Sequence, residues 1–268
     1  MRNQAYQTIR VEAAGPVVTI RLDRPEVHNA FNADMIRELH DAFEDVRTDS
    51  DARVAVFTGR GRSFCAGADL NWMKEVIAYS REQNLEESLQ IAALLEKIFT
   101  LPKPVIAQVN GTAIGGGTGF LSACDIVMAA DSARFGLSEV KLGLVPAAIS
   151  PYVVRRIGEA RAREYFLTGE RIPAARAREI GLVNEVVPAD RLEEAVSRTV
   201  DRLLTSGPSA IARCKELLLR VPGMPLSEAG EYTARLIADL RVSDEGQEGM
   251  AAFLEKRRPR WVSTGKES

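Results

Sequence analysis

Three short segments of the sequence combine residue types that can hold negative charge or move a proton. The first is Gly115-Gly116-Gly117, between a predicted strand and a predicted helix. The first N–H groups of a helix lack internal acceptors and lie at its positive end, and glycines let a ligand approach them. Such a segment suits a developing negative oxygen, although a tight turn that packs helix against strand uses the same residues. A dinucleotide fingerprint and a P-loop are excluded, because Phe120 breaks the glycine spacing and no Gly-Lys-Ser/Thr follows.

The second and third segments supply further amides and a carboxylate. Residues 64–69, Phe-Cys-Ala-Gly-Ala-Asp, are small enough to expose backbone amides, and Asp69 could cap a following helix. Glu139 has apolar neighbours in the sequence, so we expect its carboxyl group to have a raised pKa and to serve as acid and base. Each segment also has a purely structural explanation: a loop for residues 64–69, and a helix N-terminus after Ser138 for Glu139.

The composition excludes several other kinds of site. The chain has 268 residues with 35 basic and 37 acidic side chains, and this net charge of −2 argues against a nucleic acid or an anionic membrane as the main partner. His28 and His40 are the only histidines, so a three-histidine metal site is excluded and a Ser-His-Asp triad has few ways to form. We therefore expect no bound metal.

The cysteines and the apolar segments favour a cytoplasmic protein. Cys65, Cys124 and Cys214 form no CxxC pair, which fits a reducing compartment, and the first thirty residues lack a signal-peptide core. Residues 104–124 carry no charge over a length that could span a membrane. Their five glycines and two amide side chains favour instead a buried strand, loop and helix of a soluble core.

The spacing of apolar residues predicts the elements that must position these segments. Strands are predicted at 6–11, 17–22, 54–58, 105–109 and 126–129. Helices are predicted after a cap at Asn32, over 83–100 and over 117–124. Strands that alternate with helices indicate the α/β class.

The pattern changes after about residue 190, where it becomes helical almost to the end. Breaks are expected at Gly207-Pro208, between Pro222 and Pro225, and at Ser243. The chain is therefore divided into an α/β core over residues 1–195 and a helical C-terminal region over residues 196–268.

In order and spacing, these segments resemble the enoyl-CoA hydratase/isomerase (crotonase) family. The matching segments are RPEVHNAF at 24–31, FCAGAD at 64–69, KPVIAQVNGTAIGGG at 103–117, CDIVMAADSARFGLSEVKLGLVP at 124–146, LTGERIPAARAREIGLVNEVVP at 167–188 and EGMAAFLEKRRP at 248–259. The resemblance covers nearly the whole chain. It implies a spiral core of repeated ββα units, followed by C-terminal helices that mediate assembly into a homotrimer or a hexamer.

The resemblance also assigns roles to particular residues. The backbone amides of Ala68 and Gly116 match the two oxyanion-hole donors that grip a thioester carbonyl, and Glu139 matches a catalytic glutamate. Segments that line the coenzyme A site are matched at Glu26, His28, Ala30, Ala66, Asp69 and Leu70. Phe253 and Lys256 match C-terminal residues that reach coenzyme A in family trimers. The implied partner is an acyl-CoA thioester substrate; since coenzyme A belongs to that substrate, no separate cofactor is expected.

Two departures from the family pattern stand out. Two-glutamate hydratases carry a second glutamate two residues after the triple glycine, where this chain has Gly119. The family's P-G-x-G-G loop is replaced by PAAISP at 146–151, in which Ser150 and Pro151 predict the cap and first residue of a helix. We expect the acyl pocket beside this loop to have a changed shape.

The resemblance leaves more than one activity open. The missing second carboxylate favours a Δ3,Δ2-enoyl-CoA isomerase with Glu139 as its single proton shuttle, or a one-glutamate hydratase. Residues 138–159, SEVKLGLVPAAISPYVVRRIGE, look like bacterial hydratases of branched glutaconyl-CoA esters, which include 3-methylglutaconyl-CoA in leucine breakdown. We therefore expect an enoyl-CoA hydratase first and an isomerase second. A non-catalytic coenzyme A-binding protein of the same fold is the third alternative.

Overall fold

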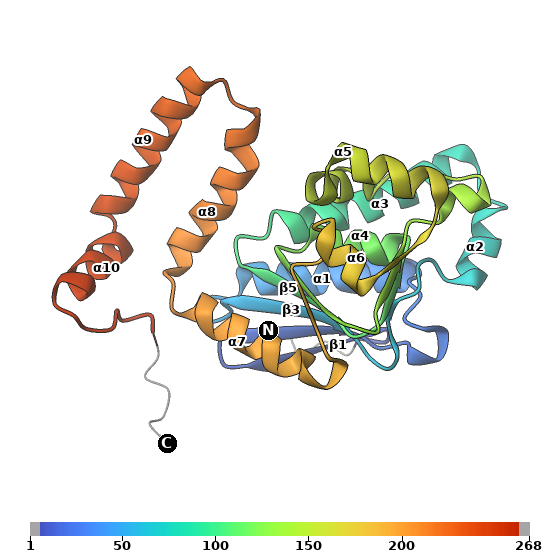
Figure 1. Ribbon diagram of the computed structural model, residues 1–268, viewed down its shortest axis with the longest axis horizontal. Helices are drawn as coiled ribbons and strands as arrows, with labels where there is room; N and C mark the ends of the chain where they lie inside the picture. Colours follow the sequence, from blue (N-terminus) through green and yellow to red (C-terminus); the bar gives the residue numbers. More distant parts are fainter. Residues whose placement is uncertain (1–5, 263–268) are drawn as a thin grey trace.

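The computed structural model describes residues 6–262 and has a six-stranded sheet at the centre of its main body (Figure 1). The strand order is β1-β2-β3-β5-β7-β10, in which β1 and β2 are antiparallel and the other neighbours are parallel. The strands are β1 (Ile9–Ala14), β2 (Val17–Leu22), β3 (Val54–Gly59), β5 (Val105–Val109), β7 (Ile126–Ala130) and β10 (Glu185–Val187). The predicted α/β class is confirmed.

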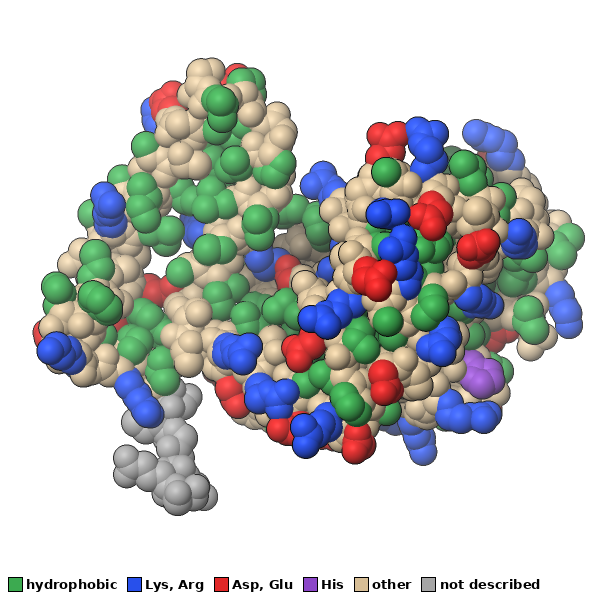
Figure 2. Space-filling view, in the orientation of Figure 1, with side chains coloured by type: hydrophobic (Ala, Val, Ile, Leu, Met, Phe, Trp, Pro, Cys, Tyr) green, Lys and Arg blue, Asp and Glu red, His purple; other side chains and the backbone are tan. Residues whose placement is uncertain are grey.

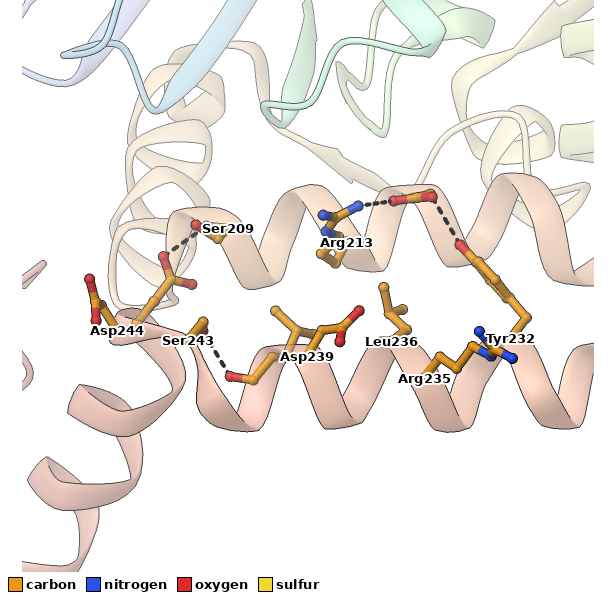
Figure 3. Close-up of a pocket in the computed structure, with 11 residues that line it drawn as sticks. Ser209, Arg213, Tyr232, Arg235, Leu236, Asp239, Ser243 and Asp244 are labelled. Atoms are coloured by element: carbon orange, nitrogen blue, oxygen red, sulfur yellow. Dashed lines mark hydrogen bonds and ion pairs between the residues drawn. The ribbon is translucent and has the colours of Figure 1, made fainter.

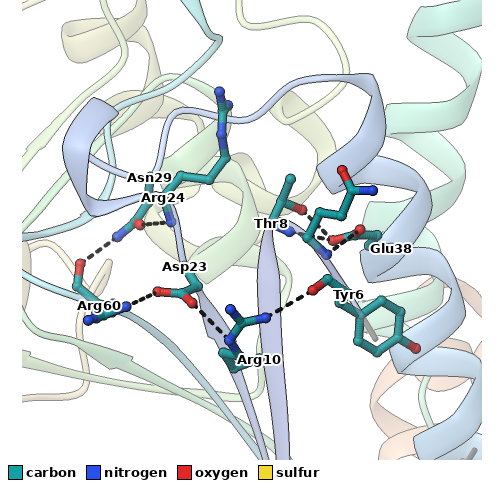
Figure 4. Close-up of polar contacts among 9 residues, drawn as sticks. Tyr6, Thr8, Arg10, Asp23, Arg24, Asn29, Glu38 and Arg60 are labelled. Atoms are coloured by element: carbon teal, nitrogen blue, oxygen red, sulfur yellow. Dashed lines mark hydrogen bonds and ion pairs between the residues drawn. The ribbon is translucent and has the colours of Figure 1, made fainter. Parts of the chain in front are cut away.

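Only the first of the predicted strands begins clearly elsewhere, at Ile9 rather than at residue 6. The reason is a competing acceptor: the N–H groups of Gln7 and Thr8 donate to the buried Glu38 carboxylate instead of to a neighbouring strand (2.8 and 2.9 Å). Figure 4 shows this contact between the start of the chain and Glu38.

Both faces of the six-stranded sheet are covered, as the fully buried strand β3 requires. Ala55 and Phe57 point into the larger apolar core, which also contains the inner face of helix α1 (Ala33–Thr48). Val54 and Val56 belong to a second core, which is closed by helix α7 (Leu192–Leu204). The helix predicted after Asn32 is confirmed as α1, and the Asn32 side chain accepts the Met35 N–H.

A second sheet of four short strands lies next to the first and carries the segments with candidate chemistry. Its order is β4-β6-β8-β9, with β4 to β8 parallel and β9 antiparallel. The strands are β4 (Ser63–Cys65), β6 (Thr112–Ile114), β8 (Arg134–Gly136) and β9 (Arg171–Pro173). Each is too short to show a clear period in the sequence, so this sheet was not predicted.

Further helices pack around these sheets. They are α2 (Leu70–Val76), α3 (Arg81–Phe99), α4 (Gly116–Ala123), α5 (Ser150–Thr168) and α6 (Ala174–Glu179). The predicted helices over 83–100 and 117–124 are confirmed as α3 and α4. The uncharged tract 104–124 becomes β5, β6 and α4, and within the described residues no helix is long and apolar enough to cross a membrane.

Beyond α7, three helices form an arm that extends to one side of the main body (Figure 1). They are α8 (Pro208–Arg220), α9 (Leu226–Val242) and α10 (Asp244–Leu254), so the predicted helical pattern and its three breaks are confirmed. The boundary predicted between residues 195 and 196 lies inside α7, which packs on the sheet. Residues 1–5 and 263–268, the outer ends of the two predicted regions, lie outside the described residues.

Candidate active site

The three segments singled out in the sequence follow three adjacent strands of the four-stranded sheet. Residues 66–69 follow β4, residues 115–117 follow β6, and residues 137–139 follow β8. Because β4, β6 and β8 are parallel, their carboxyl ends meet at one edge, which is where α/β sheets bind ligands. The sheet therefore brings together Ala68, Gly116 and Glu139.

Ala68 is held by a short parallel bridge to Phe31. The Phe31 N–H donates to the Gly67 carbonyl, and the Asp69 N–H donates to the Phe31 carbonyl (2.8 and 2.9 Å). The Ala68 N–H points away from this bridge, and it has no acceptor among residues 6–262. A fixed and unused amide donor is what an oxyanion hole needs.

Gly116 is the first residue of α4, so its N–H has no acceptor within the helix. The preceding Gly115 has φ 53° and donates its N–H to the Gly136 carbonyl of β8 (2.8 Å). A side chain at position 116 would collide with the Phe31 ring, because an ideal Cβ would lie 2.6 Å from Phe31 Cε1. The glycine at 116 is therefore needed for close packing as well as for access.

The carboxyl group of Glu139 lies beside the start of α4. Its Oε1 is 3.1 Å from the ideal Cβ position of Gly115, and its Oε2 is buried with no hydrogen-bond partner in the described structure. Burial raises the pKa of Glu139, as the apolar sequence around it predicted. Glu139 as a whole is half-buried, and its Oε2 has no partner in the described structure. Such a carboxyl group next to free amides is suited to proton transfer on a bound molecule.

Asp69 has both carboxylate oxygens engaged within the protein. Oδ1 accepts the Asn71 N–H and caps α2, as predicted, while Oδ2 pairs with the Arg24 guanidinium (2.8 and 2.7 Å). Burial alone would raise the pKa of Asp69, but the hydrogen bonds from Asn71 and Arg24, together with the charge of Arg24, lower it overall. Asp69 therefore anchors the backbone next to Ala68, and its predicted place at the coenzyme A site stays a prediction.

Asn29 bonds to the backbone of three separate segments around this region, and no local pattern in the sequence indicates this role. The side chain is fully buried; it accepts the Arg24 N–H and donates to the Arg60 carbonyl (both 2.9 Å), as Figure 4 shows. It also donates to the Ser63 carbonyl (2.8 Å). Both His28 and Asn29 have a positive φ, 53° and 57°. Such a conformation costs energy in residues with a side chain, and the three bonds of Asn29 help to hold this segment, together with the bond from the Asn29 N–H to the Arg24 carbonyl (2.8 Å).

Most of the predicted coenzyme A residues lie close together, along the pairing of residues 24–31 with residues 66–69. The Ala66 N–H donates to the His28 carbonyl (3.0 Å). Glu26 and His28 are exposed, Ala30 is buried, Ala66 is half-buried, and Leu70 is exposed. Phe253 and Lys256 lie at the end of α10 on the arm, so one chain does not bring them to this group.

The two departures from the family pattern meet in the structure. An ideal Cβ at Gly119 would lie 2.1 Å from Cγ2 of Ile149, the residue that precedes α5. The prediction that Ser150 caps this helix was wrong by one position, because Ser150 is its first residue and Ile149 stands at the cap. The Ser150 hydroxyl donates instead to the Ala147 carbonyl (2.8 Å) and holds the PAAISP loop closed.

Two open clefts lie outside this edge of the sheet. The larger, about 590 Å³, runs between α8 and α9 of the arm (Figure 3). There Glu216 accepts hydrogen bonds from Arg213 and Tyr232 (2.7 and 3.0 Å). The smaller, about 360 Å³, lies between α1, α2 and α3. Neither contains a predicted site residue, and residues 6–262 contain no cluster of side chains suited to a metal ion.

This fold, with free amides and a carboxyl group at one sheet edge, defines an α/β protein of the crotonase type. A model of the enoyl-CoA hydratase/isomerase family matches residues 12–264, so the chain belongs to that family. The short-chain-enoyl-CoA hydratase of Clostridium acetobutylicum is 32% identical over 254 residues, which cover 92% of this chain and 95% of the relative.

Solved structures agree with this assignment. An enoyl-CoA hydratase from Shewanella pealeana has a TM-score of 0.93 at 39% identity, covering 95% of this chain and 96% of its own. Pseudomonas aeruginosa AtuE has a TM-score of 0.93 at 36% identity, and the match covers 96% of this chain and 100% of the AtuE chain.

Proposed function

We propose that the protein is an enoyl-CoA hydratase, which adds water across the 2,3 double bond of an acyl-CoA thioester. The observation that carries this proposal is the position of the Glu139 carboxyl group beside Gly115, next to the unused N–H groups of Gly116 and Ala68. Relatives named as enoyl-CoA hydratases at more than 30% identity support it. The product is a 3-hydroxyacyl-CoA.

In the proposed reaction, the N–H groups of Ala68 and Gly116 donate to the thioester oxygen. The Glu139 carboxylate accepts a proton from water as the water oxygen bonds to C3, and the electrons of the double bond move toward the thioester. The resulting enolate oxygen is stabilised by the two amides. Protonated Glu139 then returns the proton to C2, so that one water is added and the carboxylate is restored.

The test is a steady-state assay with crotonyl-CoA and 3-methylglutaconyl-CoA, in which water addition is scored by product analysis. We expect turnover by the wild type and a loss of at least ~10²-fold with Glu139→Gln. Unchanged turnover in this variant would remove Glu139 from the mechanism. Acyl-CoA binding without turnover of any ester would favour a non-catalytic coenzyme A-binding protein.

A second candidate is a Δ3,Δ2-enoyl-CoA isomerase, which is favoured by Gly119 in the place of a second glutamate. A single carboxyl group suffices to move a proton between C2 and C4. The same assay with a 3-enoyl-CoA ester separates the two activities, since an isomerase yields the 2-enoyl ester without a gain of water.

For the substrate, we infer a branched glutaconyl-CoA ester such as 3-methylglutaconyl-CoA, as in leucine degradation. The support is the local resemblance of residues 138–159. For the assembly, we infer a homotrimer or a hexamer of cytoplasmic subunits. The support is the arm, whose apolar side chains Leu218, Val242, Phe253 and Leu254 are between 73% and 83% exposed in one chain.

A further inference from the structure

The absence of a second glutamate and the loss of the P-G-x-G-G loop looked like separate changes in the sequence. In the structure they are the two sides of one contact. An ideal Cβ at Gly119 would lie 2.1 Å from Ile149 Cγ2 and 2.7 Å from Ile149 Cβ. Non-bonded carbon atoms pack at about 3.5–4.0 Å, so no side chain fits at position 119 while Ile149 is present.

Ile149 cannot move aside to make room. Its side chain is 4% exposed and belongs to the main apolar core. Its Cβ is bonded to the backbone, and that backbone begins α5 by accepting the N–H groups of Tyr152 and Val153 (both 3.1 Å). A rotation about χ1 therefore relieves the contact with Cγ2 and leaves the contact with Cβ.

The filled volume lies in the core directly beside the candidate active site. The Gly119 N–H donates to the Gly115 carbonyl (3.0 Å), so the two glycines are one helical turn apart, about 5.4 Å along the axis. The Glu139 carboxyl group lies against Gly115. Ile149 thus occupies space about one turn of α4 away from the only carboxyl group that the site presents among the described residues.

We propose that Ile149 fills the volume that a second carboxylate would need, and that it thereby leaves the reaction to Glu139 alone. Gly119 and Ile149, which both depart from the two-glutamate pattern that the resemblance implies, are therefore sterically coupled in this chain. Ile149 is a residue that sets how many carboxyl groups the site can hold. The inference rests on the proposed function for its chemistry, and on packing alone for its steric part.

The steric part is tested with Gly119→Ala, because helix propensity predicts that this substitution stabilises the protein, whereas packing predicts that it destabilises the protein. Position 119 is inside α4, where alanine is favoured over glycine by about 1 kcal/mol. The contact with Ile149 should reverse this preference and lower the melting temperature by about 5 °C or more. In an Ile149→Gly background, the same substitution should leave the melting temperature unchanged or raise it.

Ile149→Val is the matched control, because valine keeps the Cβ and both γ-carbons. Gly119→Ala should therefore destabilise the Ile149→Val background as much as the wild type. If Gly119→Ala alone yields no folded protein, recovery of folding in the Ile149→Gly background, and not in the Ile149→Val background, gives the same support. An equal effect of Gly119→Ala in the Ile149→Gly background and in the wild type would overturn the proposal.

The chemical part is tested by placing a carboxylate in the opened space. We expect Gly119→Glu combined with Ile149→Gly to fold, and its pH–rate profile for crotonyl-CoA hydration to show one more ionisation than Ile149→Gly alone, because two close carboxyl groups titrate as a coupled pair. A profile identical to that of Ile149→Gly would overturn it. If no variant hydrates any ester, the proposed function fails, whereas the melting temperatures still decide the steric part.

Discussion

At the scale of single residues, Glu139 combines a position at the candidate active site with an environment that disfavours its charge. Burial raises its pKa, and its Oε2 has no partner in the described structure. The protein therefore holds a carboxyl group that would be more stable in water. Its Oε2 is therefore free to bond to a substrate, since no other group among the described residues bonds to that atom.

The raised pKa of Glu139 predicts the pH dependence of activity. In hydration the carboxylate form must accept a proton from water. The rate should therefore fall as the pH is lowered through the pKa of Glu139, with a midpoint above the ordinary glutamate value of about 4.3. A profile of kcat against pH checks this, and a midpoint at or below the ordinary value would contradict it.

The same group predicts a gain of stability on neutralisation. Because the native pKa is raised, ionising Glu139 opposes folding at pH values above its native pKa, and this effect disappears below the pKa of the unfolded chain. Glu139→Gln should therefore melt at a higher temperature than the wild type at pH 7 and at an equal temperature near pH 4. Glu12→Gln, which changes an exposed side chain with no ion pair among the described residues, is the control, and it should show no such gain.

The pair of Arg24 and Asp69 positions the Ala68 amide. Asp69→Asn keeps an oxygen to accept the Asn71 N–H but removes the charge that faces Arg24. Since Ala68 is next in the chain, we expect kcat to fall by ~10-fold or more while KM changes less. Asp34→Asn, which removes an exposed partner of Arg37, is the control. A change in KM alone would instead support the contact with coenzyme A expected from the sequence.

At the scale of elements, the site depends on which segment follows which strand. The amides and the carboxyl group come directly after β4, β6 and β8, so the pairing of these strands fixes their relative positions. Asn29 makes the equivalent connection for the segment that carries Phe31, by joining it to the end of β3 and to β4.

Asn29 should therefore matter for stability more than its side-chain size suggests. Asn29→Ala leaves the Arg24 N–H and the Arg60 carbonyl without partners, and leaves the Ser63 carbonyl only the longer bond from Asn110 (3.4 Å), which should lower the free energy of unfolding by about 3 kcal/mol. Asn29→Asp keeps the acceptor for Arg24 but loses both donated bonds. Urea denaturation measures both variants; a loss below about 1 kcal/mol for Asn29→Ala would show that water or a shift of the backbone replaces these bonds.

The sequence predicted the long elements and their caps better than the short ones. Asn32 and Asp69 could be recognised as caps because the signal is local, a short polar side chain just before an amphipathic run. The strands β4, β6 and β8 are too short to show a period. Arg24 and Phe31 could not be recognised, since their partners are distant in the chain and only the resemblance pointed to that region.

At the scale of the whole molecule, the arm is notable for the apolar side chains that it exposes. Figure 2 shows hydrophobic side chains along its visible surface, which include residues of α8, α9 and α10. The arm is joined to the main body by a few polar contacts. Arg53 donates to the Trp261 carbonyl, and Lys215 donates to the Lys103 carbonyl and pairs with Asp125 (2.8, 3.1 and 2.6 Å).

If the arm mediates assembly, polar substitutions on it should dissociate the oligomer without unfolding the main body. We expect Phe253→Ser combined with Leu254→Ser to shift the mass measured by light scattering from a trimer or hexamer toward a monomer. Ile77→Ser, which changes an equally exposed apolar side chain on the main body, is the control. A wild type that is monomeric at all concentrations would contradict the inferred assembly.

The contact between Gly119 and Ile149 also bears on how this chain could have diverged from two-glutamate relatives. If any side chain at 119 is incompatible with isoleucine at 149, only one order of the two substitutions avoids a collision. A chain with a side chain at 119 would have to lose it before isoleucine could stand at 149, and the reverse change would have to begin at 149. The packing therefore fixes the order of the two substitutions in each direction, and the glycine at 119 is maintained by a neighbour that has no part in the proposed reaction.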